Sequence, residues 1–128
     1  MADVNRGNRP LSPQRSIYRP QLNSATSIFH RITGCGLAVT SALVVWWFAA
    51  AATGRGSFAF ANWVLSSWVG GLVMILSLLA FWYHFFNGIR HLFWDAGRGF
   101  DLDFVAKSAV ATIAAAVVMT VITVIAVI

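Results

Sequence analysis

Three long stretches without a formal charge dominate this sequence. The stretch between Arg31 and Arg55 has 23 residues, the stretch between Arg55 and Arg90 has 34, and the stretch after Lys107 has 21. A helix needs about 20 apolar residues to cross the hydrocarbon core of a bilayer, which is about 30 Å thick. The first and last stretches therefore fit one membrane span each, and the middle stretch fits one span and a short extra segment.

The composition agrees with a membrane protein. Of the 128 residues, 59% are hydrophobic and 10% are charged, whereas soluble domains carry about 25% charged residues. This hydrophobicity excludes a disordered chain, and the single cysteine excludes a disulfide scaffold. The net charge of +5 is divided between the N-terminal segment and the loops. No basic face is therefore expected for binding nucleic acid.

We predict an all-α integral membrane protein of one domain, residues 1–128, with three transmembrane helices. Their expected bounds are about 28–53, 64–93 and 104–127. Residues 54–57 are typical of a turn and residues 57–62 of a short interfacial segment. The candidate N-caps of the first helix are Ser24, Thr26 and Ser27. From Ser108 onward the last helix has only Ser and Thr as polar side chains, so we expect it to pack through Ala114–Ala116 and to hold no cofactor.

The basic residues predict the orientation of the chain in the membrane. Eight of them lie in the N-terminal segment up to Arg31 or beside the loop between the second and third spans, against Arg55 alone in the first loop. The positive-inside rule places the N-terminus in the cytoplasm and the C-terminus on the opposite side. Residues 1–27 lack the apolar core of a signal peptide, which favours a bacterial inner membrane protein or a mature mitochondrial one. Their three prolines predict an extended cytoplasmic arm that docks on another protein.

Ionisable side chains inside the spans are the candidates for function, because burying them in lipid is costly. His84 lies six residues before Arg90, about 9 Å deeper in the membrane, and His91 shares its helix face. His30 and Arg31 lie at the cytoplasmic end of the first helix. A histidine in a membrane helix can ligate haem iron, or it can instead hydrogen-bond a neighbouring helix.

The remaining polar groups could serve the same ligand. Cations at the membrane edge suit the anionic propionates of a haem, and His30, Arg31 and His91 are placed to supply them. Ser27 and Arg31 share a face and could bind a ligand carbonyl, or they could serve helix capping and lipid phosphate. His84 and His91 are about 10 Å apart on one helix, and His30 is expected to be too shallow to face His84 across a haem. A second axial histidine would then come from another chain.

Two motifs carry a family resemblance. Ser27–Gly34 reads S-x-x-H-R-x-T-G, and His84–Gly97 reads H-x-x-x-G-I-R-H-L-x-W-D-x-G. Together with Arg9–Pro13 and Ile17–Tyr18, they resemble the cytochrome b membrane-anchor subunit of succinate dehydrogenase, respiratory complex II. The resemblance covers essentially the whole chain. Arg15 departs from it, because relatives usually carry an apolar residue there, and this concerns only the docking of the arm.

The resemblance implies a subunit that is not catalytic on its own. It implies that His84 is an axial ligand of haem b and that a second three-helix anchor supplies the other histidine. It also implies contacts of His30 and Arg31 with the haem propionates, and for His91 and Asp95 a propionate contact or a hydrogen-bond network. The other implied partners are an iron–sulfur subunit and a flavoprotein subunit, besides membrane lipid.

The resemblance further implies that Ser27, Ile28 and Arg31 line a ubiquinone site. The whole complex would oxidise succinate to fumarate and reduce ubiquinone. Ser27 would hydrogen-bond a quinone carbonyl, and Arg31 would stabilise negative charge that develops on the quinone. Two alternatives stay open at this point. One is a fumarate reductase-type anchor that uses menaquinone, and the other is a structural or transport subunit without a cofactor.

Overall fold

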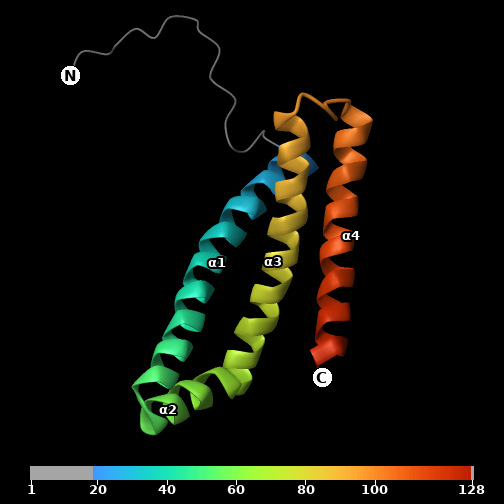
Figure 1. Cartoon of the computed structure of the whole chain (residues 1–128). Coiled ribbons are helices and arrows are strands. Elements are labelled where there is room, and N and C mark those ends of the chain that lie inside the picture. Colours follow the sequence, from blue (N-terminus) through green and yellow to red (C-terminus); the bar gives the residue numbers. More distant parts are fainter. Residues whose placement is uncertain (1–18, 128) are drawn as a thin grey trace, which may run out of the picture.

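The computed structural model describes residues 19–127, and these residues form helices and no strand (Figure 1). The helices are α1 (Leu22–Thr53), α2 (Arg55–Ser66), α3 (Trp68–Asp95) and α4 (Leu102–Val127). Helices α1, α3 and α4 are long and apolar enough to cross a membrane. The predicted all-α fold with three membrane-spanning helices is therefore confirmed.

Helix α1 begins earlier than predicted. It starts at Leu22, so the last six residues of the predicted extended arm, 22–27, are helical. The predicted N-caps all lie inside the helix, and Gln21 takes the N-cap position without a side-chain hydrogen bond. The end of α1 agrees with the sequence, since Gly54 follows Thr53 with a φ of 139° that favours glycine. Residues 1–18, which make up most of the predicted arm, lie outside the described structure.

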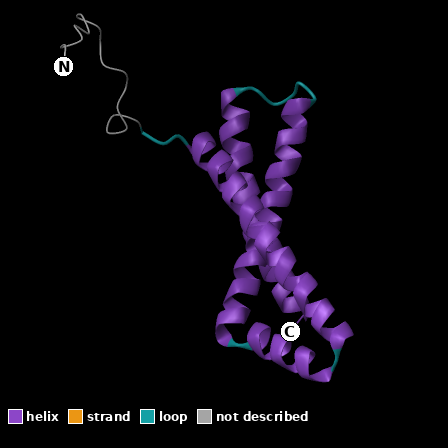
Figure 2. Ribbon diagram, turned by 90° about the vertical axis from the view of Figure 1, so that its left-hand side faces the viewer, coloured by secondary structure: helices purple, strands orange, loops and turns teal. Residues whose placement is uncertain are grey.

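The connection between the first two spans is mostly helical, and the predicted short segment 57–62 lies inside this helix. The turn narrows to Gly54, and α2 follows as 12 residues that lie across the end of the bundle between α1 and α3 (Figures 1 and 2). Ala61 is fully buried on the inner side of α2. The Ser67 hydroxyl then caps α3 by accepting a hydrogen bond from the Gly70 amide at 3.1 Å. The second span therefore starts at Trp68, four residues later than predicted.

Helix α3 lies between α1 and α4 and packs on both (Figure 1). On α4 the packed face is a stripe of mostly small residues at helical spacing: Val105, Ala109, Thr112, Ala116 and Thr120. Within the predicted packing run Ala114–Ala116, only Ala116 is buried. Small residues let membrane helices approach closely. Such close packing matters because lipid provides no hydrophobic driving force for helix association.

Polar side chains add a few bonds between the helices. Thr40 Oγ1 on α1 lies 2.8 Å from Ser77 Oγ on α3. The Trp82 indole on α3 donates to the Thr123 hydroxyl on α4 at 3.1 Å. In contrast, most large apolar side chains along the spans are exposed, as expected for surfaces that face lipid or another membrane subunit.

The loop from α3 to α4 closes the other end of the bundle, where α1 also begins (Figure 1). We call this end the loop end. Gly97 ends α3 with a φ of 73°, and the amides of Gly97 and Arg98 donate to the carbonyls of Trp94 and Phe93. This pattern is a Schellman motif, which requires a left-handed residue that glycine supplies without steric cost. Helix α3 therefore ends two residues after the predicted bound at residue 93.

Candidate functional site

Three histidines meet near the loop end. The rings of His30 on α1 and His84 on α3 stack with centroids 3.9 Å apart and planes 12° apart. The ring of His91 lies 5.0 Å from that of His30 at 48°. The structure thus brings together the three histidines that the sequence singled out, and we call them the histidine cluster.

The expected depth difference between His30 and His84 is wrong, because their rings are in contact. The expectation assumed a helix that starts near residue 28, which would place His30 in its first turn. In the structure α1 starts at Leu22, so His30 lies two turns inside the helix. The two rings still could not bind one iron from opposite sides. Axial imidazoles present a nitrogen edge to the metal, whereas these two rings face each other without room for a macrocycle.

The hydrogen bonds of His84 define its tautomer. Its Nδ1 atom lies 3.1 Å from the backbone carbonyl oxygen of His30 and 3.3 Å from the Thr33 hydroxyl. A carbonyl oxygen only accepts hydrogen bonds, so Nδ1 must carry the proton. Both bonds that His84 forms with residues 19–127 use Nδ1, which leaves the lone pair of Nε2 for another ligand. This is the arrangement in which a backbone carbonyl orients a metal-binding histidine.

Gly34 makes room for this imidazole. A Cβ atom at Gly34 would lie 3.1 Å from His84 Cε1, closer than carbon atoms normally pack. The glycine of the first motif therefore leaves the space that His84 occupies. Gly88, one turn after His84, has open space where a Cβ atom would be.

Behind the histidine cluster lies a buried polar group that the sequence analysis missed. Asn87 is 0% exposed, and its amide nitrogen lies 3.5 Å from His91 Nε2. Its oxygen accepts from Nη1 of Arg90 at 3.4 Å, and Arg90 itself is only 6% exposed. From the sequence alone, Arg90 marks the membrane edge. Arg90 lies three residues after Asn87 and four before Trp94. Residues at these spacings are neighbours on a helix surface, so these two contacts of Arg90 could have been predicted from the sequence.

The candidate quinone residues lie on a more open part of α1. Ile28 and Arg31 are exposed, and Ser27 is half-buried. Ser27 and Arg31 are four residues apart and share a helix face. Neither forms a hydrogen bond or ion pair with another helix within residues 19–127. The structure places them beside His30 but does not complete a pocket around them. Asp95 is exposed at the C-terminal end of α3.

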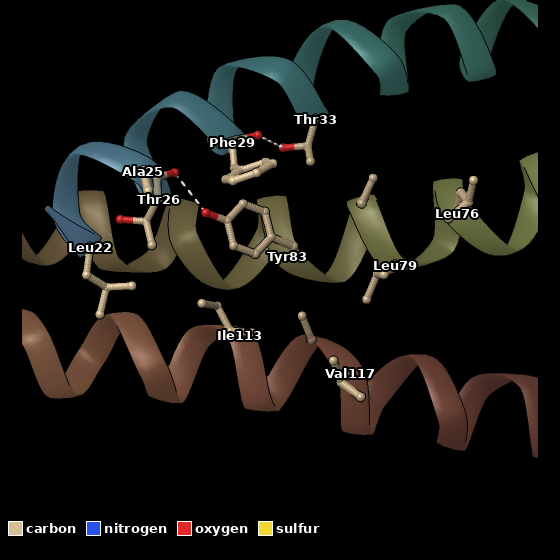
Figure 3. A pocket seen from close by; sticks show the side chains of 12 residues that line it. Leu22, Ala25, Thr26, Phe29, Thr33, Leu76, Leu79, Tyr83, Ile113 and Val117 are labelled. Carbon is tan, nitrogen blue, oxygen red and sulfur yellow. Dashed lines mark hydrogen bonds between the residues drawn. The ribbon is translucent and has the colours of Figure 1, made fainter. Parts of the chain in front are cut away.

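A groove of about 420 Å³ lies on another side of α1, where α1, α3 and α4 meet (Figure 3). Its lining is apolar apart from hydroxyl groups, and the Tyr83 hydroxyl donates to the carbonyl of Thr26 at 2.8 Å. Phe29 lines the groove and is two residues from both Ser27 and Arg31. Residues two apart point about 160° away from each other around a helix. The groove is therefore separate from the candidate quinone face.

Within residues 19–127, no three His, Cys, Asp or Glu side chains are arranged to hold a bare metal ion. The histidine cluster is accordingly suited to offering one nitrogen to a metal whose remaining ligands come from elsewhere. Helix α4 contributes no residue to this cluster.

Comparison with known proteins places these features in one family. The family described as succinate dehydrogenase/fumarate reductase transmembrane subunit matches residues 5–123. The succinate dehydrogenase cytochrome b556 subunit of Paracoccus denitrificans is 50% identical over 125 residues, covering 98% of this chain and 96% of that protein. The cytochrome b556 subunit of Rickettsia bellii is 40% identical over 94 residues, 73% of each chain. The cytochrome b560 subunit of Reclinomonas americana is 39% identical over 101 residues, 75% of this chain and 70% of that protein. This chain therefore belongs to the family of succinate dehydrogenase/fumarate reductase transmembrane subunits.

Proposed function

We propose that this chain anchors a succinate:ubiquinone oxidoreductase in the membrane, ligates haem b through His84, and forms part of the ubiquinone site. The anchor role is supported by family membership and by the three membrane-spanning helices. The haem role is supported by the name cytochrome b of its relatives. The observation that carries the haem proposal is that Nε2 of His84 has no hydrogen-bond partner among residues 19–127, while the His30 carbonyl orients the ring.

The residues of the histidine cluster fit a haem. The imidazole of His84 is a standard iron ligand when Nδ1 carries the proton and Nε2 is free. Nδ1 of His30 is buried and has no hydrogen-bond partner in the described part of the chain. A buried polar atom of this kind requires a partner, and a haem propionate would supply one. His91 and Arg31 flank this position as further donors. A bound haem contributes one-electron redox chemistry.

A second chain is needed to complete the haem site. Support comes from the stacking of His30 on His84, which leaves no room for a haem between these two rings, and from the position of His91 on the same helix as His84. We assign the other axial histidine to a second three-helix anchor subunit, which would cover apolar side chains that α1 and α3 leave exposed. The iron–sulfur and flavoprotein subunits would bind at the loop end, because the candidate quinone residues lie there and electrons must reach them.

The quinone chemistry is assigned to α1. The Ser27 hydroxyl would donate a hydrogen bond to a quinone carbonyl, with Ile28 packing against the ring. The Arg31 guanidinium carries a positive charge and would stabilise negative charge on the reduced oxygen. Arg31 is exposed, so its side chain is free to reach a ligand at the membrane edge. Asp95 and His91 would take part in a hydrogen-bond network at the same end.

The orientation follows from the same charge distribution. We propose that the loop end faces the cytoplasm of a bacterium and that the C-terminus faces the periplasm. Arg19, Arg31, Arg90, Arg98 and Lys107 all lie toward the loop end, whereas Arg55 lies at the opposite end on α2. The N-terminal arm would then lie on the side of the catalytic subunits.

Replacing Arg31 with Ala tests the quinone assignment. We expect the purified complex to keep its subunits and its rate of succinate oxidation with phenazine methosulfate, but to lose most of its rate with a ubiquinone analogue. Removing a charged donor that acts on the reduced oxygen costs about 10²- to 10³-fold in comparable sites. Arg55→Ala is the matched control at the other end of the bundle, with no expected effect on either rate. Equal losses of assembled complex and of both rates in Arg31→Ala would make Arg31 a folding residue and refute the assignment.

A further inference from the structure

Arg90 is a buried cation whose partners are all neutral. Its guanidinium uses all five N–H groups, although no Asp or Glu pairs with it within residues 19–127. It also lies over the ring of Trp94, 4.2 Å from the ring centroid. A buried charge without an opposite charge is retained only when hydrogen bonds and a π face replace the water that it lost.

The partners of Arg90 come from three helices. On α4, the Ser108 hydroxyl accepts from Nε at 3.0 Å and the Val105 carbonyl accepts from Nη2 at 3.0 Å. On α1, the Asn23 side chain accepts from Nη2 at 3.1 Å, and the Thr26 hydroxyl accepts from Nη1 at 3.4 Å. Arg90 therefore joins α1 and α4 to α3 at the loop end.

The α1 partners lie in the first two turns of α1, and this helix end has no side-chain N-cap. Gln21 provides no side-chain cap for α1, and no acidic residue in the first turn offsets the helix dipole. Unsupported helix ends fray. Asn23 lies one turn before Ser27, so fraying at Asn23 would leave Ser27 at a loose helix end. The bonds from Arg90 do not satisfy the free amides of this turn, but they tether it to α3 and α4 through the Asn23 and Thr26 side chains.

The geometry points to a specific role: we propose that Arg90 is a positioning residue for the quinone site, holding the first turn of α1 so that Ser27 and Arg31 stay in place. The inference rests on the proposed quinone role of those two residues. The role requires the planar fork of arginine, because it reaches α1 and α4 at the same time. Lysine keeps the charge but has three donors on a single nitrogen and cannot form this arrangement.

The test compares two variants that each remove one acceptor from the same guanidinium. Asn23→Ala removes the shorter of the two bonds to α1, and Ser108→Ala removes one of the two bonds to α4. We expect Asn23→Ala to raise KM for a ubiquinone analogue by roughly threefold or more, in line with the loss of a bond to a charged group. Ser108→Ala should leave this KM within error of the native value. Both should keep the native rate with phenazine methosulfate, which bypasses the quinone site.

Arg90→Lys is the stronger variant, with Arg98→Lys in the exposed loop as its control. We expect Arg90→Lys to raise KM for the ubiquinone analogue by roughly tenfold in the complex that still assembles. A native KM in Arg90→Lys would show that charge alone suffices and would overturn the proposal. Equal KM values in Asn23→Ala and Ser108→Ala would overturn it as well, because the effect would then not pass through α1.

The proposed function and this inference fail in different ways. If Arg31→Ala keeps full quinone turnover, the quinone site itself is misassigned. If Arg31→Ala loses quinone turnover while Asn23→Ala and Arg90→Lys behave like the native complex, only the positioning role of Arg90 is refuted.

Discussion

Replacing Gly34 with Ala should weaken haem binding although residue 34 does not touch the iron. The added Cβ atom would lie 3.1 Å from Cε1 of His84, whereas carbon atoms pack comfortably at about 3.5–4.0 Å. The imidazole would have to move away from α1 by about 0.4 Å. The bond from His84 Nδ1 to the His30 carbonyl, now 3.1 Å, would lengthen to the limit of hydrogen bonding.

The size of the effect follows from that bond. One hydrogen bond is worth about 0.5–1.5 kcal/mol net, which corresponds to a factor of about 2 to 12 in affinity. The helix itself should not suffer, because Ala is favoured over Gly inside a helix by about 1 kcal/mol. A loss of haem affinity without a loss of assembled complex is therefore the expected signature.

Haem transfer to excess apomyoglobin measures this affinity in the purified complex. Gly36→Ala is the matched control on the same helix, because a Cβ atom there meets nothing within 4 Å. We expect faster and more complete transfer from Gly34→Ala than from the native complex, and native behaviour for Gly36→Ala. Identical transfer from both variants and the native complex would refute the idea that Gly34 sets the position of His84.

Two further predictions concern the corner between α2 and α3 and the N-terminal arm. A Cβ atom at Gly70 would collide with the backbone carbonyls of Val64 and Leu65, so Gly70→Ala should open the corner between α2 and α3 and lower the yield of assembled complex. Gly71→Ala is the control, because a Cβ atom there meets nothing within 4 Å. Equal yields of the two variants in a quantitative membrane blot would show that assembly does not need this corner. We expect the N-terminal arm to dock on the catalytic subunits. Deleting residues 2–18 should therefore let a chaotropic wash remove succinate dehydrogenase activity from membranes more easily. Activity that stays bound to the membranes as firmly as with the full chain would refute this docking.

The membrane spans could be predicted from the sequence, because the lipid bilayer strongly restricts the length and polarity of a helix that crosses it. The helix α2 could not be predicted from the sequence, because two glycines and a serine after Thr53 are typical of a turn. Only Gly54 is needed for the turn. The following residues form a helix because their inner side, through Ala61, can pack against the bundle. That packing depends on α1 and α3 and is not visible in local propensity.

The histidine cluster was predictable in part. Helical periodicity placed His84 and His91 on one face, and the structure keeps both beside His30. The stacking of His30 on His84 was not predictable, because it depends on where α1 begins and how it crosses α3. The same holds for Arg90, whose partners Asn23 and Ser108 lie 67 and 18 residues away in sequence. A charge at a span boundary is usually topogenic, and only the fold shows that this one is buried.

The axial ligand is tested most directly by the low-temperature electron paramagnetic resonance spectrum of the oxidised complex. The native complex should show a low-spin ferric haem with two imidazole ligands. His84→Met should change this signal to one with a different axial ligand or a high-spin iron, while His91→Met keeps the two-imidazole signal. An unchanged two-imidazole signal in assembled His84→Met, or its loss in His91→Met, would contradict the assignment of His84 as the iron ligand.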